Sequence, residues 1–339
     1  MLGNYLRALR LVRTGRWLAL LAAVFALGLA ACSDDAASTT PDATSTSTAT
    51  AEATGTTEAT STPVATEAVG PIEVTDSSGM TLTLDGPASR IVSHSPAATE
   101  ILFAIGAGEQ VVAADEFSNY PAEADALPKV TFSTPDPEQD LSFEPDLVIF
   151  SGRQESSIEH FRDLDLPVFF LQAPADIDGV FEHIRTLGTL TGHEDGAESV
   201  IADMQARLDA VAAAIEDIDE GPLVFYELTE DLYTVSSDSF IGDALAFVKA
   251  RNVAEGAEGD FPQLSSEAVV EANPDVILMA DADFVDPATV PQRAGWSGIT
   301  AVVEDRIHPV DADVMSRPGP RIVEGIESLA ALFYPDRFE

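Results

Sequence analysis

The sequence predicts an α/β protein of two lobes, each built on a parallel β-sheet, joined by one long α-helix. Apolar, β-branched strand segments alternate with helix segments on both sides of residues 194–217, which is typical of parallel sheets covered by helices. Within 194–217 the larger apolar residues recur at spacings of three and four along an Ala-rich run, which predicts a long amphipathic helix. The alternative is one more surface helix in a single large domain.

An internal repeat also indicates two related lobes. Residues 138–149 read EQDLSFEPDLVI, and residues 267–278 read EAVVEANPDVIL. In both, a Glu opens a short helix, Pro-Asp ends it, and a buried strand begins. Parallel sheets bind ligands outside the carboxyl ends of their strands, so two such lobes on one helix predict a ligand cleft between them.

The expected elements before the long helix begin with a hairpin of two alternating segments, 72–76 and 80–84. Strand 90–93 follows, and Ser95 with Pro96 suits the N-cap and first position of a helix over 97–105. The other expected elements are strands at 111–114, 146–150, 168–171, 224–228, 276–279 and 307–310, and helices at 138–143, 158–164, 180–190, 240–248, 266–272 and 322–333.

The first 31 residues have the pattern of a bacterial lipoprotein signal peptide. Four arginines form a basic region, and residues 17–29 form an apolar run too short to span a bilayer comfortably. The sequence Leu29-Ala30-Ala31-Cys32 resembles a lipobox, in which cleavage before the cysteine is followed by attachment of lipid. We therefore expect lipidation at Cys32 and an extracytoplasmic protein anchored to the cell membrane. Cys32 is the only cysteine, which excludes an intrachain disulfide and a catalytic thiol elsewhere.

Composition and charge complete the domain organisation. The Thr-, Ala- and Ser-rich run that follows Cys32 lacks aromatic residues and predicts a disordered tether. The formal net charge of −41 repels nucleic acid, so nucleic-acid binding is not expected. The predicted segments are a signal peptide at 1–31, a tether at 32–70, an N-terminal α/β lobe at 71–192, the connecting helix at 193–219 and a C-terminal α/β lobe at 220–339.

Five segments, taken in chain order, resemble class III substrate-binding proteins of ABC importers, the group that captures vitamin B12, ferric siderophores and haem. They are RIVSHSPAATEILFAI (90–105), FSNYP (117–121), EPDLVI (144–149), FPQLSSE (261–267) and RPGPR (317–321). The resemblance covers about residues 71–335 and is greatest to the vitamin B12 receptors. It implies two Rossmann-like lobes, a single connecting helix, an ABC permease as partner, and no enzymatic activity. We also expect a monomer without a resident cofactor or metal.

The same resemblance implies which residues face the ligand. They comprise a small residue after the Ser-Pro turn, aromatic faces in loops of both lobes, and a polar pair that contacts corrin side chains. These ligand-binding residues are Ala97, Phe117, Phe132, Tyr233, Phe261, Asp313 and Arg317. Several positions that are Trp or Tyr in the B12 receptors are Phe here, and Ser151 stands where a Trp would lie. These are departures from the B12 receptors. The resemblance as a whole makes cobalamin the first ligand hypothesis, with a ferric siderophore or haem as the alternative.

Glu138 and Glu267 occupy matching places in the two halves of the repeat. By the resemblance, they are the carboxylates that pair with basic residues of the permease. The competing explanation is local, because a Glu in the first turn of a helix is favoured by the helix dipole. The repeat alone does not separate these two explanations.

Two other classes of function are alternatives. A cell-surface α/β hydrolase predicts a Gly-x-Ser-x-Gly nucleophile elbow, which the sequence lacks. An adhesion or scaffolding protein would need no apolar cleft. His94 follows a strand end and is interpreted either as a ligand of a cobalt or iron centre or as a polar residue at the cleft rim.

Overall fold

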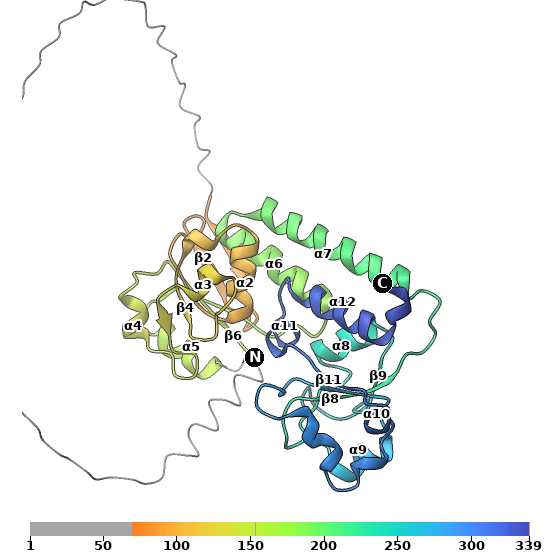
Figure 1. Ribbon diagram of the computed structural model, residues 1–339. Helices are drawn as coiled ribbons and strands as arrows, with labels where there is room; N and C mark the ends of the chain where they lie inside the picture. The colour runs from red at the N-terminus through yellow and green to blue at the C-terminus, as the bar shows by residue number, and fades with distance from the viewer. Residues whose placement is uncertain (1–69, 153, 339) are drawn as a thin grey trace, which may run out of the picture. The chain divides into compact units, whose positions relative to one another are not determined.

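The computed structural model describes residues 70–152 and 154–338 (Figure 1). The predicted signal peptide, Cys32 and all of the predicted tether except Gly70 lie outside the described residues. No helix within the described ranges has the length and apolar character needed to cross a membrane. A two-stranded antiparallel hairpin opens the described chain, with β1 at Ile72–Thr75 and β2 at Thr81–Leu84, as the alternating pattern predicted.

The N-terminal lobe is built on a five-stranded parallel sheet of order β5-β4-β3-β6-β7. Alternate strand residues face opposite sides, so Ile91 and Ile149 pack in one core and Val92 and Phe150 in another. The strands are β3 (Ile91–His94), β4 (Val111–Asp115), β5 (Lys129–Val130), β6 (Leu147–Ser151) and β7 (Val168–Leu171). The helices are α2 (Pro96–Ala104), α3 (Ala122–Asp125), α4 (Pro137–Leu141), α5 (Glu155–Arg162) and α6 (Ile177–Thr191). A 3₁₀ turn, η1, lies at Gly108–Gln110.

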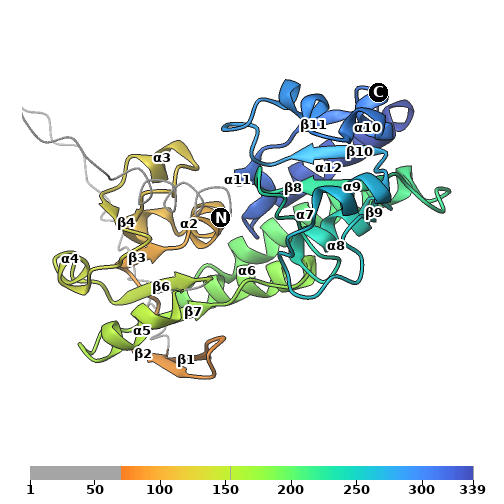
Figure 2. The same ribbon diagram turned by 90° about the horizontal axis from the view of Figure 1, so that it is seen from below.

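The C-terminal lobe contains a four-stranded parallel sheet of order β11-β10-β8-β9 (Figure 2). Its strands are β8 (Leu223–Glu227), β9 (Arg251–Asn252), β10 (Val276–Met279) and β11 (Ile307–Pro309). Its helices are α8 (Phe240–Phe247), α9 (Ser266–Ala272), α10 (Thr300–Val303), α11 (Ala312–Ser316) and α12 (Ile322–Phe333), with 3₁₀ turns η2 (Pro287–Gln292), η3 (Trp296–Gly298) and η4 (Pro335–Arg337). Phe225 and Met279 pack with Trp296 on one face of this sheet, and Val224 and Leu278 join the larger core on the other.

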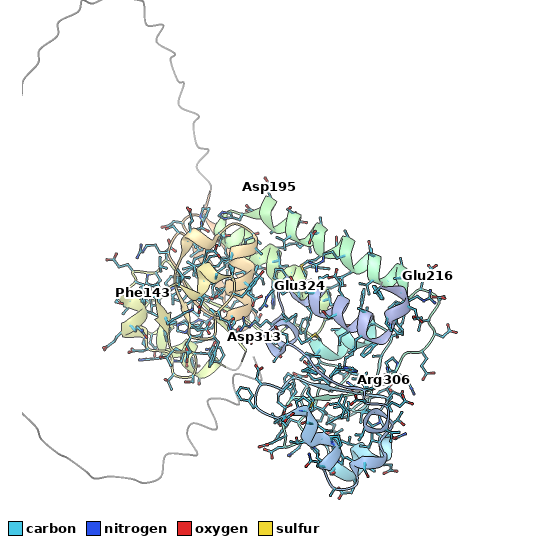
Figure 3. All side chains as sticks on the ribbon, in the orientation of Figure 1. Phe143, Asp195, Glu216, Arg306, Asp313 and Glu324 are labelled. Atoms are coloured by element: carbon cyan, nitrogen blue, oxygen red, sulfur yellow. The ribbon has the colours of Figure 1, made fainter. Side chains whose placement is uncertain are left out.

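One long helix, α7 (Glu194–Ala214), connects the two lobes and packs along α6 and α12. In Figure 3 the label Asp195 lies at the start of α7, and the label Glu216 lies just beyond its end. Its buried residues include Ile201, Met204 and Leu208, which belong to the core that also takes in one face of both sheets. The predicted two-lobe α/β fold joined by one helix is therefore confirmed.

The helix boundaries differ in detail from the predicted ones. The long helix ends at Ala214 rather than 217, because Ile215 leaves helical geometry while its side chain is buried. The helix predicted at 138–143 begins at Pro137, where Asp136 caps it, and ends at Leu141. The strands β5 and β9 were not predicted, because two residues are too few to show an alternation.

Candidate functional site

The loop that carries Phe117 is held by a buried carboxylate at the end of β4. Asp115 Oδ1 accepts a hydrogen bond from the Phe117 backbone N–H at 2.8 Å, and Oδ2 accepts one from the Ser118 hydroxyl at 2.6 Å. Burial raises the pKa of Asp115, and the hydrogen bonds from Ser118 and Phe117 oppose that rise. Asp115, at the end of β4, thus fixes the position of the Phe117 backbone.

Phe117 and Phe132 form an aromatic pair in the N-terminal lobe. Their ring centroids lie 5.6 Å apart with the planes at 75°, an edge-to-face arrangement. The backbone of Phe132 is held on both sides, because its N–H donates to Glu116 Oε2 at 2.6 Å and its carbonyl accepts from Gln154 Nε2 at 2.9 Å. Both residues are half-buried, so each is partly accessible to solvent.

Arg317 joins the segment after α11 to the N-terminal lobe. Its guanidinium donates to Glu100 Oε1 at 2.7 Å, Asn119 Oδ1 at 2.8 Å and the Phe117 carbonyl at 3.0 Å. Asp313 Oδ2 lies 2.7 Å from the same guanidinium. The Arg317 side chain is only 1% exposed. Its two terminal nitrogens meet protein groups, whereas its Nε is buried without a hydrogen-bond partner among the described residues.

Arg321 extends this arrangement. Its Nε and Nη2 donate to the two carboxylate oxygens of Glu100 at 2.8 and 2.6 Å, and its guanidinium lies 4.1 Å from the centre of the Tyr120 ring. We call Glu100, Asp313, Arg317 and Arg321 the inter-lobe ion cluster. Asp313 is labelled in Figure 3 on α11, near the N-terminal lobe.

The predicted ligand residues of the C-terminal lobe lie on two neighbouring segments. Tyr233 forms a β-bridge with Gln263, and the backbone N–H of Thr234 donates to the Pro262 carbonyl at 2.9 Å. The Tyr233 side chain is exposed, whereas Phe261 is half-buried against the main core. These contacts bring Tyr233 and Phe261 to one region of this lobe.

The structure therefore assembles the predicted ligand residues in two groups. Phe117, Phe132, Asp313 and Arg317 form one group, joined by the contacts above, and Tyr233 and Phe261 form the other. Ala97 lies in the first turn of α2, 5% exposed, and its carbonyl faces Gly319 of the Arg317–Arg321 segment. Convergence of both groups on one ligand stays a prediction.

Two cavities occur near these elements. The larger, of about 1010 Å³, is bounded by α2, the segment at α3, α7 and the start of α12, and Tyr120 and Arg321 contribute to its wall. The smaller, of about 440 Å³, lies beside Trp296 and Arg293 in the C-terminal lobe. Neither lining includes the predicted aromatic ligand residues.

His94 is not at a cleft rim, which corrects one of the two interpretations of this residue. Its side chain is fully buried at the end of β3, stacked on Phe150 at 4.6 Å between ring centres and edge-on to Phe161. Its Nε2 lies 2.7 Å from Asp140 Oδ2. Within residues 70–152 and 154–338, no group of three or more His, Cys, Asp or Glu side chains is arranged to hold a metal ion.

Glu138 and Glu267 occupy equivalent positions in the two lobes. Each is the second residue of a short helix, α4 or α9, and each side chain is exposed. Asp136 and Ser265 cap the two helices by accepting a hydrogen bond from a first-turn backbone N–H. The internal repeat is thus also a repeat of local structure.

Sequence reasoning missed Glu100, Asn119 and Asp115, and it included Arg321 only as part of the RPGPR segment at 317–321. A usable signal was present for Glu100, which stands in the apolar helix segment 97–105, where a charged residue is rarely buried without a partner. The spacing of Arg317 and Arg321, four residues apart ahead of a helix, was a second signal.

Comparison with known proteins places this architecture in a family. Residues 91–314 match the periplasmic binding protein family. An uncharacterised ABC transporter substrate-binding lipoprotein of Bacillus subtilis, YvrC, is 33% identical over 279 residues, which is 80% of this chain and 88% of that protein. A cobalamin-binding protein of Halobacterium salinarum is 30% identical over 275 residues, 78% of this chain and 74% of that protein.

A solved structure agrees in fold. The periplasmic haem-binding protein RhuT of Roseiflexus sp. RS-1, in its apo form, superposes with a TM-score of 0.66 at 26% identity, covering 74% of this chain and all of that one. These likenesses are to binding proteins and not to enzymes. The chain belongs to the periplasmic binding protein family and is a substrate-binding protein of the ABC transporter type.

Proposed function

We propose that this protein captures cobalamin outside the cytoplasm and delivers it to an ABC permease, acting as a lipid-anchored monomer. The observation that carries the choice of ligand is the 30% identity to a cobalamin-binding protein, which extends over 78% of the chain. The aromatic pair Phe117–Phe132 and the exposed Tyr233 support it, because flat rings suit the face of a large macrocycle.

In this proposal the inter-lobe ion cluster does not contact the ligand but holds in place the loop that does. Arg317 holds the Phe117 carbonyl and Asp313, and so fixes the loop that presents the Phe117 ring. Asp115 fixes the same loop from the strand side. Pre-ordering of an aromatic platform lowers the entropy lost on binding and so favours affinity.

Haem is the second candidate, favoured by the structural likeness to a haem-binding protein. Haem iron needs an axial ligand from the protein, such as His, Cys, Met or Tyr. Tyr233 is the exposed residue of this type among the proposed ligand residues, whereas His94 is buried against Asp140. The Tyr233 hydroxyl therefore separates the two ligands, since cobalamin carries its own lower axial base.

Isothermal calorimetry of the soluble Cys32→Ala chain with cyanocobalamin, haemin and a ferric hydroxamate siderophore tests the proposal. We expect cyanocobalamin to bind at least about tenfold more tightly than the other two, a difference of about 1.4 kcal/mol. Tyr233→Phe serves as the matched control and should leave cobalamin affinity within about threefold, because the ring is retained. Tighter binding of haemin, lost in Tyr233→Phe, would select haem instead.

Delivery is assigned to Glu138 and Glu267. Each presents an exposed carboxylate at the start of its helix, one on each lobe, which suits a transporter of two like subunits that each offer Arg. The helix-dipole explanation predicts that the Glu138→Ala, Glu267→Ala double variant loses a little stability and docks normally. Docking predicts normal ligand affinity and slower association, most clearly at low salt.

A further inference from the structure

Both helices that carry the proposed docking carboxylates have little apolar anchorage. In α4 the buried residues are Pro137 and Asp140, and in α9 only Val269 is buried. Short helices depend on tertiary contacts for their stability and placement. Polar contacts must therefore contribute much of what holds each helix against its lobe.

In the N-terminal lobe, one such contact runs to the end of the central strand β3. Asp140 and His94 are both completely buried, with Oδ2 and Nε2 2.7 Å apart. The imidazole cannot turn freely, because Phe150 stacks on its face and Phe161 meets its edge. Asp140 stands two residues after Glu138, so a rigid ring on β3 holds the helix that presents this carboxylate.

In the C-terminal lobe, a chain of contacts runs from the equivalent strand to α9. Glu227, the last residue of β8, is fully buried and accepts both ends of the Arg293 guanidinium at 2.5 and 2.6 Å. Arg293 lies 4.7 Å from the centre of the Trp296 ring. Trp296 Nε1 in turn donates to Ser266 Oγ at 2.7 Å, and Ser266 directly precedes Glu267.

The two links begin at matching places. His94 pairs with Phe150 in the β3–β6 ladder, and Glu227 pairs with Met279 in the β8–β10 ladder. In each lobe the docking helix, α4 or α9, is followed by a strand, β6 or β10. His94 and Glu227 are the last residues of the strands that pair with β6 and β10, respectively. The chemistry differs between lobes. His94 contacts Asp140 of α4 directly, whereas Glu227 is connected to α9 through Arg293 and Trp296.

We propose that the His94–Asp140 pair and the Glu227–Arg293–Trp296–Ser266 chain are positioning links that hold Glu138 and Glu267 in fixed orientation for the permease. This inference rests on the docking role proposed above. A carboxylate on a mobile helix loses conformational entropy when it docks. If both helices are held in place, less entropy is lost and the protein associates with the permease faster.

A distance measurement tests the links without any permease. The Cys32→Ala chain contains no cysteine, so Glu138→Cys and Glu267→Cys can each carry one spin label, and pulsed electron resonance gives the label–label distance distribution. We expect this distribution to broaden in Asp140→Leu, which removes the acceptor for His94, and in Ser266→Ala, which removes the acceptor for Trp296. Asp140→Asn keeps an acceptor and Ser297→Ala changes an exposed serine nearby, so both should retain the narrow distribution.

A second measurement separates the links from the docking role. Fluorescently labelled Cys32→Ala protein is mixed with membrane vesicles from cells that make the transporter, and the rate of capture is followed at low salt. With Glu138 and Glu267 in place, Asp140→Leu and Ser266→Ala should each slow capture about fivefold, while cyanocobalamin affinity is unchanged. A purely structural role would lower the unfolding temperature and leave the capture rate of the folded protein unaltered.

The outcomes are distinct. Unchanged distance distributions in both Asp140→Leu and Ser266→Ala would overturn the positioning links, whatever the vesicles show. Normal capture of the Glu138→Ala, Glu267→Ala protein would instead overturn the docking role. If Asp140→Leu fails to fold, Ser266→Ala, a small change at the surface end of its link, still decides the question.

Discussion

Replacing Arg317 with alanine separates two roles that can be assigned to this residue. As a direct ligand contact, Arg317 would matter for affinity and little for stability. As the centre of the inter-lobe ion cluster, it would matter first for stability, because its 1% exposed side chain pairs with Glu100 and Asp313 and holds the Phe117 carbonyl. The structure favours the second role.

The expected loss of unfolding free energy in Arg317→Ala depends on the buried charges that remain after the arginine is removed. Removing one partner of a buried ion pair costs about 3–5 kcal/mol, because the other charge is left buried. Glu100 keeps Arg321 as a partner, so we expect the lower end, about 3 kcal/mol. For a body of this size each kcal/mol lowers the melting temperature by about 2–4 °C, so the shift should be about 6–12 °C.

Urea unfolding followed by circular dichroism measures the free energy of unfolding, and thermal unfolding measures the melting temperature, with Arg185→Ala as the matched control. Arg185 pairs with Glu198 at 2.8 Å, but the two side chains are 47% and 60% exposed. Such a surface pair contributes less than about 1 kcal/mol. If Arg317→Ala is no less stable than Arg185→Ala and yet loses cobalamin affinity, the ion cluster is not structural and Arg317 contacts the ligand.

Three further predictions concern the anchor, the ligand face and acid stability. Cys32→Ala should move the protein from the membrane to the soluble fraction, because the attached lipid is its expected anchor; membrane retention would contradict this. Phe261→Ala should weaken cobalamin binding by about 1–3 kcal/mol in calorimetry, and an unchanged affinity would remove Phe261 from the ligand face. Burial lowers the pKa of His183 from 6.5 to about 4. As the pH falls, the unfolded chain therefore takes up the proton before the folded protein does. The contribution of neutral His183 to stability is complete above about pH 6.5 and is lost as the pH falls toward 4. Between pH 7 and pH 4 the unfolding free energy should therefore fall by ~3 kcal/mol more in the wild type than in His183→Leu, and parallel curves would refute this.

Local chemistry explains why much of the fold was predictable. The helix at 266–272 has both its boundaries in the sequence, since Ser265 caps its start and Asn273 ends it in the left-handed region. Asp146 and Asp275, the Pro-Asp residues of the repeat, each bind the backbone at the start of a neighbouring strand. Both lobes thus contain the same local unit of short helix, Pro-Asp and strand, and its twelve residues can be recognised in the sequence.

The site was less predictable, because its key contacts join residues far apart in the chain. Glu100 and Arg317 are 217 residues apart, and no local pattern pairs them. His94 was expected near a cleft because it ends a strand, but the aromatic rings of Phe150 and Phe161 bury it. Strand order decided its environment, since β6 lies beside β3 and brings Phe150 over the imidazole.

Uptake of radiolabelled cobalamin by living cells tests the central claim most directly, because it requires both capture and delivery. Cells that lack this gene are given back the wild-type chain, the Cys32→Ala chain or the Glu138→Ala, Glu267→Ala chain. We predict that uptake at nanomolar cobalamin is lost without the gene, restored by the wild type, and restored poorly by the Glu138→Ala, Glu267→Ala chain although that protein binds cobalamin normally. Uptake that is the same with and without the gene would contradict the assignment of this protein to cobalamin import.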